Sequence, residues 1–119
     1  MKMLGSLFQL SSCTSKAEGQ FVAQLIPDSG HPVFQGHFPG RPITPGACLI
    51  QLALELAQHC FHVPMQLDTI KNVKFLRLIQ PNNIETLSCI LLFEASSSKL
   101  QTEFIIDKDV CSKMTFLLR

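Results

Sequence analysis

His37 lies in a proline-rich segment that leads directly into an apolar helical pattern. The segment from Gly36 to Gly46 contains three prolines, and each proline fixes its own φ and restricts the residue before it. Because the segment ends where the helical pattern begins, it holds an imidazole beside a helix N-terminus, where free N–H groups favour negative charge. A general base beside such a helix end predicts chemistry at a carbonyl compound.

The helical pattern over Gly46–Phe61 is apolar around most of its circumference. Leucine, isoleucine, alanine and cysteine recur there at helical spacing, which predicts a central, buried helix. The remaining polar positions fall at i, i+4, i+7 and i+8 and form a single stripe of Gln51, Glu55, Gln58 and His59.

The rest of the chain is typical of strands joined by turns. Gln20–Ile26 is strand-like, whereas Lys2–Leu10 gives a weak signal and Ser11–Gly19 is predicted as a loop. Four strand-like segments follow the helix: Thr69–Leu78, Thr86–Ala95, Leu100–Asp107 and Val110–Leu118. A tight turn around Lys108 predicts that the last two form a hairpin. An α+β fold, with an antiparallel sheet wrapped around one long central helix, satisfies this order.

Composition sets the remaining bounds. The chain has 119 residues, enough for one domain and too few for two. Hydrophobic residues make up 46% and charged residues 16%, an excess of apolar residues that we interpret as an oligomer interface. The formal net charge of +1 does not favour nucleic-acid binding. No apolar stretch approaches the roughly 20 residues of a membrane span.

The five cysteines are widely spaced, at Cys13, Cys48, Cys60, Cys89 and Cys111. Their number is odd and no CxxC pair occurs, so we expect neither a disulfide framework nor a metal site. Reduced, mostly buried thiols in a cytoplasmic protein are the prediction. Cys48 falls in the first helical turn, where a thiolate pKa can fall, but no partner base other than His37 is evident.

The run HPVFQGHFPGRPITPG over His31–Gly46 closely resembles the active-site segment of the β-hydroxyacyl-acyl-carrier-protein dehydratases of fatty-acid synthesis. A looser similarity continues through Ile70–Arg77 and Pro81–Asn83, and the tail from Leu87 is similar to the family's closing strands. The resemblance implies the hotdog fold, as a single dehydratase-like domain over residues 1–119.

The resemblance also implies the active-site roles. His37 would remove the α-proton of a β-hydroxyacyl thioester, and the N–H of Gly46 would hydrogen-bond the thioester carbonyl as enolate charge develops. The thioester would be carried on the phosphopantetheine of acyl carrier protein or on CoA, with no other cofactor. The remaining substrate-binding positions would be Phe34, Gly36, Phe38, Pro45 and Gln51.

The implied assembly is a homodimer or a higher assembly of dimers, in which the two sheets join and the active sites lie at the subunit interface. The basic residues Arg41, Lys71, Lys74 and Arg77 form either a patch for an acidic carrier protein or an ordinary solvated surface.

The chain departs from the family at the catalytic acid. That acid lies fourteen residues after the histidine, on the helix of the partner subunit, and here the position is Gln51. An amide can hold a water or a hydroxyl but cannot deliver a proton as an acid does. The family commonly has glutamine four residues later, where this chain has Glu55. Four residues rise about 6 Å along a helix, so Glu55 either acts as the acid through a water or on a differently placed substrate, or has a structural partner.

Three functions therefore stay open. The first is dehydration of β-hydroxyacyl thioesters to trans-2-enoyl thioesters. The second is a catalytically weak or inactive hotdog subunit that binds acyl carrier protein or a partner hotdog chain supplying the acid. The third is an acyl thioesterase in which Glu55 or His37 activates water.

Overall fold

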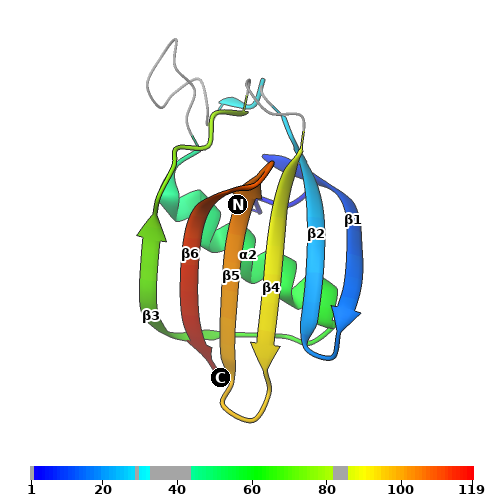
Figure 1. Cartoon of the computed structure of the whole chain (residues 1–119), viewed down its shortest axis with the longest axis vertical. Coiled ribbons are helices and arrows are strands. Elements are labelled where there is room, and N and C mark those ends of the chain that lie inside the picture. The colour runs from blue at the N-terminus through cyan, green and yellow to red at the C-terminus, as the bar shows by residue number, and fades with distance from the viewer. Residues whose placement is uncertain (1, 29, 33–43, 82–85) are drawn as a thin grey trace.

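The architecture is a six-stranded antiparallel sheet that packs on one long helix (Figure 1). A computed structural model describes residues 2–28, 30–32, 44–81 and 86–119. Its elements, in chain order, are β1 (Phe8–Ala17), β2 (Gln20–Pro27), α2 (Gly46–Phe61), β3 (Leu67–Phe75), β4 (Leu87–Glu94), β5 (Lys99–Ile106) and β6 (Asp109–Leu118). The strands lie in the order β1-β2-β4-β5-β6-β3, so β1 and β3 form the two edges of the sheet.

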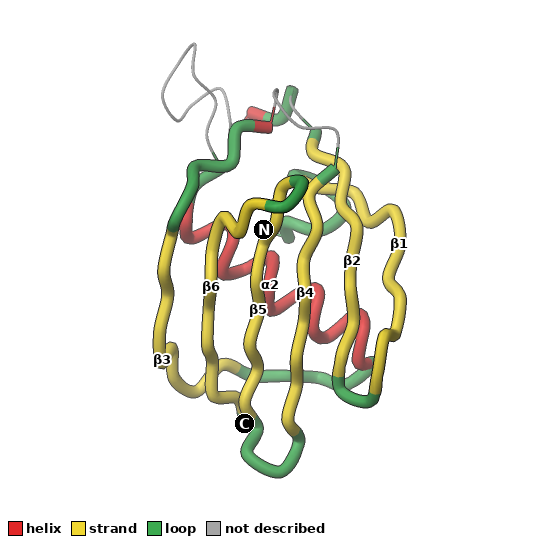
Figure 2. The backbone as a smooth tube through the Cα atoms, in the orientation of Figure 1, coloured by secondary structure: helices red, strands yellow, loops and turns green. Residues whose placement is uncertain are grey.

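The helix α2 lies behind the sheet in Figure 2 and crosses its strands diagonally. Its buried residues are Leu49, Leu52, Ala53, Leu56, Ala57 and Cys60. They belong to one hydrophobic core with the inward side chains of the strands, among them the fully buried Phe104 and Phe116. The predicted central, buried helix over Gly46–Phe61 is confirmed with these bounds. Within the described ranges, no helix combines the length and the hydropathy that a bilayer crossing requires.

The strands predicted after the helix are confirmed, with small shifts at their ends. β5 and β6 form the predicted hairpin, in which Ile106 pairs with Asp109 across the turn. Asp107 adopts the left-handed conformation in this turn, with φ 57°, a geometry that asparagine and aspartate tolerate better than other side chains.

The prediction of a loop over Ser11–Gly19 is wrong, because β1 continues to Ala17. β1 is an edge strand that pairs only with β2 among the described residues, for example Thr14 with Val22. Most of its side chains from Ser11 onward are exposed. A strand with little buried surface has no alternating apolar pattern, so its sequence resembles a loop.

The prediction that all thiols are reduced is also wrong for one pair. Cys13 in β1 and Cys60 in the last turn of α2 are joined by a disulfide, with their Cα atoms 6.5 Å apart. The two residues are 47 positions apart, and only the packing of the helix end against the edge strand brings them together. The other three cysteines are free thiols.

Replacing both bonded cysteines, as Cys13→Ser with Cys60→Ser, should lower the free energy of unfolding. The crosslink closes a loop with a sequence separation of 47 residues, for which the chain-entropy model gives about 4 kcal/mol. Urea denaturation of the oxidised chain, of the same chain with reductant and of the double variant would measure the loss. Cys48→Ser, which removes a free thiol, is the control. An identical midpoint with and without reductant would contradict the prediction.

Candidate functional site

The N-terminus of α2 presents backbone donors that no side chain satisfies. Pro45 precedes the helix in an extended conformation (φ −62°, ψ 144°), and no side chain caps it. The Pro45 carbonyl accepts from the N–H groups of Cys48 (3.0 Å) and Leu49 (3.2 Å). Within the described part of the chain, the N–H groups of Gly46 and Ala47 have no acceptor, and no acidic residue lies in the first turn. The helix end can therefore bind an anionic oxygen.

Gly46 has a close neighbour in the ring of Phe75. A Cβ atom there would lie 2.7 Å from Cζ and 3.0 Å from Cε2 of Phe75. Phe75 is the last residue of the edge strand β3, and 52% of its surface is exposed. The absence of a side chain at Gly46 thus brings the helix N-terminus next to the open edge of the sheet.

The polar stripe of α2 joins Gln51 to Glu55 and Glu55 to the start of the chain. The Gln51 Nε2 atom donates to Glu55 Oε2 at 2.8 Å. The N–H of Met3 lies 3.1 Å from Oε1 and 3.0 Å from Oε2 of Glu55, and the N–H of Leu4 donates to Oε1 at 2.9 Å. Met3 is buried in the core. The Glu55 carboxylate therefore holds the N-terminal turn against the helix, which is the structural partner that the sequence left open.

A hollow of about 350 Å³ adjoins Glu55 and is lined by Lys2, Leu4, Glu55, Gln58 and His59. Gln58 makes two hydrogen bonds to the backbone. Its Nε2 donates to the Leu54 carbonyl and its Oε1 accepts from the N–H of Met65, each at 3.4 Å. Of the predicted stripe, Gln51 and His59 are the exposed members.

Four of the predicted site residues lie outside the described residues, namely Phe34, Gly36, His37 and Phe38. Their roles stay predictions. Among the described ones, Pro45 and Gly46 form the helix N-terminus, and Gln51 and Glu55 follow on the same helix.

Cys48 does not have the environment of a reactive thiol. Burial raises its pKa, the opposite of the lowering that a first-turn position can produce. The thiol is therefore mostly protonated at neutral pH, which argues against a nucleophilic role.

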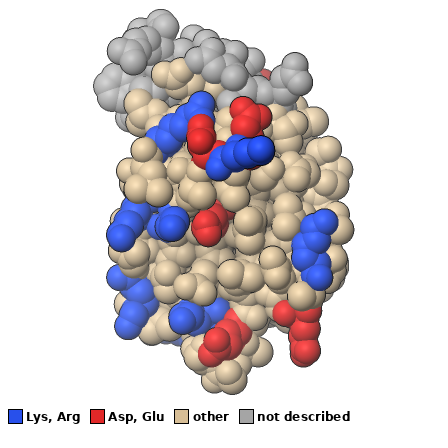
Figure 3. Space-filling view, in the orientation of Figure 1, with Lys and Arg blue, Asp and Glu red and all other residues tan. Residues whose placement is uncertain are grey.

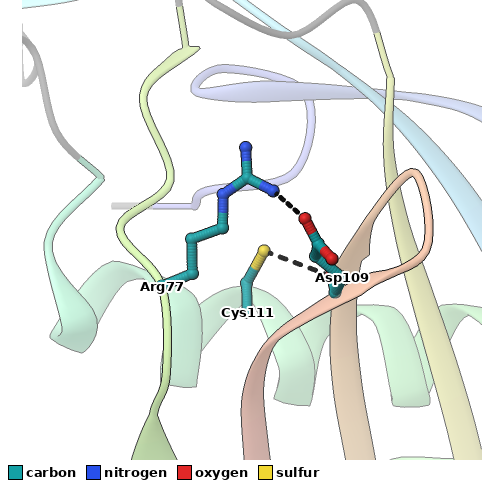
Figure 4. Close-up of polar contacts among 3 residues, drawn as sticks. All are labelled: Arg77, Asp109 and Cys111. Atoms are coloured by element: carbon teal, nitrogen blue, oxygen red, sulfur yellow. Dashed lines mark hydrogen bonds and ion pairs between the residues drawn. The ribbon is translucent and has the colours of Figure 1, made fainter.

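Strand pairing brings together a different set of basic residues from the predicted one. Arg77 is not a free cation, because its Nη1 lies 2.7 Å from Asp109 Oδ2 (Figure 4). Lys71 and Lys74 lie in β3, and Lys74 pairs with Lys113 of β6. Figure 3 shows basic side chains along the side of the sheet where these strands lie, with acidic ones among them. Lys113 is a residue that sequence reasoning missed, since it is distant in the chain. Arg41 lies outside the described residues.

Gly46→Ala should displace the Phe75 ring, because the new Cβ would lie 2.7 Å from its Cζ atom. Since that ring is half exposed and can turn away, and alanine favours a helix over glycine, the expected loss of unfolding free energy is below about 1 kcal/mol. Phe75→Leu removes the two ring atoms nearest to that Cβ, so the double variant should lose less than the sum of the single losses. A double-mutant cycle by urea denaturation measures this difference. Additive losses would show that the contact does not matter.

Glu55→Ala should release the N-terminal turn, because the N–H groups of Met3 and Leu4 lose their acceptor. We expect a loss of about 2 kcal/mol and faster hydrogen exchange at these two amides. Glu55→Gln retains a carbonyl acceptor and should preserve most of the protection. Unchanged exchange in Glu55→Ala would contradict the anchoring role.

The sequence is similar to curated dehydratases of fatty-acid synthesis. It is 35% identical over 60 residues to the 3-hydroxyacyl-[acyl-carrier-protein] dehydratase FabZ of Clostridium acetobutylicum. This match covers 44% of this chain and 42% of that protein. FabZ of Rickettsia rickettsii is also 35% identical over 60 residues, covering 44% of this chain and 41% of that protein. The matched region thus spans about two fifths of these relatives' length.

The fold is similar to that of solved structures over nearly the whole chain. The dehydratase heterocomplex ApeI:P from Xenorhabdus doucetiae matches with a TM-score of 0.83 at 24% identity, covering 93% of this chain and 96% of that chain. An uncharacterised protein from Erwinia carotovora subsp. atroseptica matches with a TM-score of 0.77 at 22% identity, covering 95% and 96%. These likenesses confirm the predicted hotdog fold. The family model described as ApeI dehydratase matches residues 13–115, and the chain therefore belongs to the ApeI-like dehydratase family.

Proposed function

We propose that this chain dehydrates β-hydroxyacyl thioesters to trans-2-enoyl thioesters in fatty-acid or related acyl-chain biosynthesis. The observation that carries the proposal is the N-terminus of α2, where the N–H groups of Gly46 and Ala47 lack an acceptor among the described residues. Removal of an α-proton develops negative charge on the thioester oxygen, and backbone donors at a helix end stabilise that charge.

In this proposal His37 takes the α-proton, because an imidazole titrates close to neutral pH. The N–H of Gly46 binds the thioester oxygen. Pro45, together with Phe34, Gly36 and Phe38, lines the acyl site. The thioester is carried by acyl carrier protein or CoA, since phosphopantetheine is the arm shared by both carriers.

The leaving hydroxyl needs a proton, and Gln51 has none to give as an acid. Glu55 is the nearest carboxylate on the stripe, but its oxygens already accept from Met3, Leu4 and Gln51. This observation favours a second candidate, in which a partner hotdog chain supplies the acid. The ApeI:P structure is by its title a heterocomplex of a dehydratase, and we propose a comparable pairing as the alternative to a homodimer.

The edge strand β3 is the proposed contact with the second chain. Among the described residues it pairs only with β6. Large apolar side chains are exposed on it and just beyond it, with relative exposures of 45–57%: Ile70, Phe75, Leu76 and Leu78. An apolar sheet edge that is open to water favours pairing with another chain. Because the Phe75 ring lies close to Gly46, this contact would adjoin the helix N-terminus.

The lysines of β3 and β6 offer a docking surface for an acidic carrier protein. Lys74 and Lys113 are opposite one another on neighbouring strands, and Lys71 lies three residues away on β3. None of them forms an ion pair within the described residues, and Lys113 also lies opposite Glu103 of β5. The excess of positive charge here would attract an acidic partner.

The test is a mass-spectrometric assay of the purified chain with 3-hydroxyoctanoyl-acyl carrier protein. We expect the acyl group to lose one water. His37→Ala should slow this loss by about a hundredfold or more, whereas His59→Ala, an exposed histidine at the far end of α2, should leave the rate unchanged.

The same assay separates the alternatives. Dehydration by the Gln51→Glu variant but not by the native chain would favour the second candidate, a hotdog subunit whose partner chain supplies the acid. Free 3-hydroxyoctanoic acid, with no loss of water from the acyl group, would overturn the proposal in favour of a thioesterase.

A further inference from the structure

The ring of Phe75 meets the first residue of α2 with its tip. Its Cζ, Cε2 and Cε1 atoms would lie 2.7, 3.0 and 3.4 Å from a Cβ atom at Gly46. Phe75 ends β3, and Figure 1 shows that α2 begins on the β3 side of the sheet. Since the Cβ position and the amide nitrogen are both bonded to the same Cα atom, the ring tip lies within about 5 Å of the Gly46 nitrogen.

Two buried hydroxyls near this contact have no hydrogen-bond partner within the described part of the chain. Thr44, which is 5% exposed, directly precedes the N-cap Pro45. Ser112, which is fully buried, pairs with Phe75 across β6 and β3. Buried hydroxyls are rarely left unpaired in proteins. A ligand with polar atoms would therefore find hydrogen-bonding partners here in addition to the backbone donors of the helix end.

The connectivity of a thioester decides which of its atoms can carry extra bulk at this place. When the carbonyl oxygen accepts from the N–H of Gly46, as proposed above, sulfur and Cα are the two neighbours of the carbonyl carbon. Sulfur is divalent and already carries the carrier arm, so it has no position for a branch. Cα is therefore the neighbour at which acyl groups can differ in size close to the ring of Phe75.

We propose that Phe75 is a specificity-determining residue, whose ring restricts substituents on Cα and thereby disfavours 2-methyl acyl thioesters. This inference rests on the function proposed above. The elimination is open to both kinds of substrate, because a 2-methyl-3-hydroxyacyl group retains one α-proton. In each case the Cα–H and Cβ–O bonds break, a carbon–carbon double bond forms, and the proton and hydroxide leave as water. The ring thus selects by size and not by reactivity.

The selection is moderate, because 52% of Phe75 is exposed and the ring can turn away. In Gly46→Ala, the better helix propensity of alanine offsets part of the cost of displacing the ring. A methyl group on the substrate brings no such gain. Since one additional methylene in an apolar site alters kcat/KM by about tenfold or more, we expect a preference of about tenfold for the unbranched acyl group.

The experiment measures kcat/KM for the dehydration of two pantetheine thioesters, 3-hydroxyoctanoyl and 2-methyl-3-hydroxyoctanoyl, the latter as separate C2 epimers. The native chain should prefer the unbranched compound over the better epimer by about tenfold. Phe75→Leu, which lacks the ring tip, should bring this ratio close to one. Phe75→Met, whose flexible side chain adapts its shape, should give an intermediate ratio.

Phe21→Leu is the matched control, because it makes the same change at the other end of the helix. The Phe21 ring packs against Phe61, the last residue of α2, with centroids 4.9 Å apart. Its ratio should stay at the native value. Each ratio is taken within one preparation, so a variant that lowers both rates through instability or weaker assembly leaves the ratio unchanged.

The outcomes separate the inference from the proposed function. Equal kcat/KM values for the native chain would overturn the selection at Cα and leave the dehydratase standing. A tenfold preference that persists in Phe75→Leu, or a ratio that falls as far in Phe21→Leu, would overturn the role of Phe75. If the native chain dehydrates neither compound, the proposed function fails and the inference fails with it.

Discussion

Burial of α2 against the sheet is the constraint on which the rest of the molecule depends. The helix is apolar around most of its surface, and its buried residues share one core with the fully buried side chains of the strands. Burying that surface drives folding, and it leaves few places on the helix where polar groups can act. Those places are the N-terminus at Gly46 and the stripe that begins at Gln51.

The polar stripe of α2 also makes contacts that stabilise the fold, and these contacts limit the chemistry that its side chains can perform. Glu55 binds the N-terminal turn through Met3 and Leu4, and at the other end of the helix Cys60 is bonded to Cys13 of β1. The first strand and the turn before it are thus attached to α2 at two points. Because the Glu55 carboxylate already accepts these backbone N–H groups, the proton that the proposed dehydration needs would come from the surroundings of Gln51 or from another chain.

The open edge at β3 connects the proposed chemistry to assembly. Phe75 lies at the end of β3 and its ring adjoins Gly46. A second chain that covers this apolar edge would also exclude water from the helix N-terminus, where a dry environment strengthens each hydrogen bond to a developing oxyanion. Assembly and oxyanion binding would therefore be favoured by the same contact.

Much of the fold could be predicted from the sequence because its signals are local. The bounds of α2 follow from helical apolar spacing between Pro45 and the residues after Phe61, and the β5–β6 hairpin follows from the turn around Lys108. β1 was not predicted as a strand, because an exposed edge strand has no alternation of apolar and polar residues. The motif from His31 to Gly46 identified the family and the helix end, both of which agree with the family match and the observed N-terminus of α2.

Tertiary structure alone decided the contacts between distant residues. The sequence shows Gln51 and Glu55 on one helical face, but the N–H groups that occupy Glu55 come from Met3 and Leu4, about fifty positions earlier. The Cys13–Cys60 bond and the Lys74–Lys113 pair likewise join segments that meet only in the packed sheet. Periodicity along a chain reports which side of an element faces the core, whereas the partner across a contact is set by how the elements pack together.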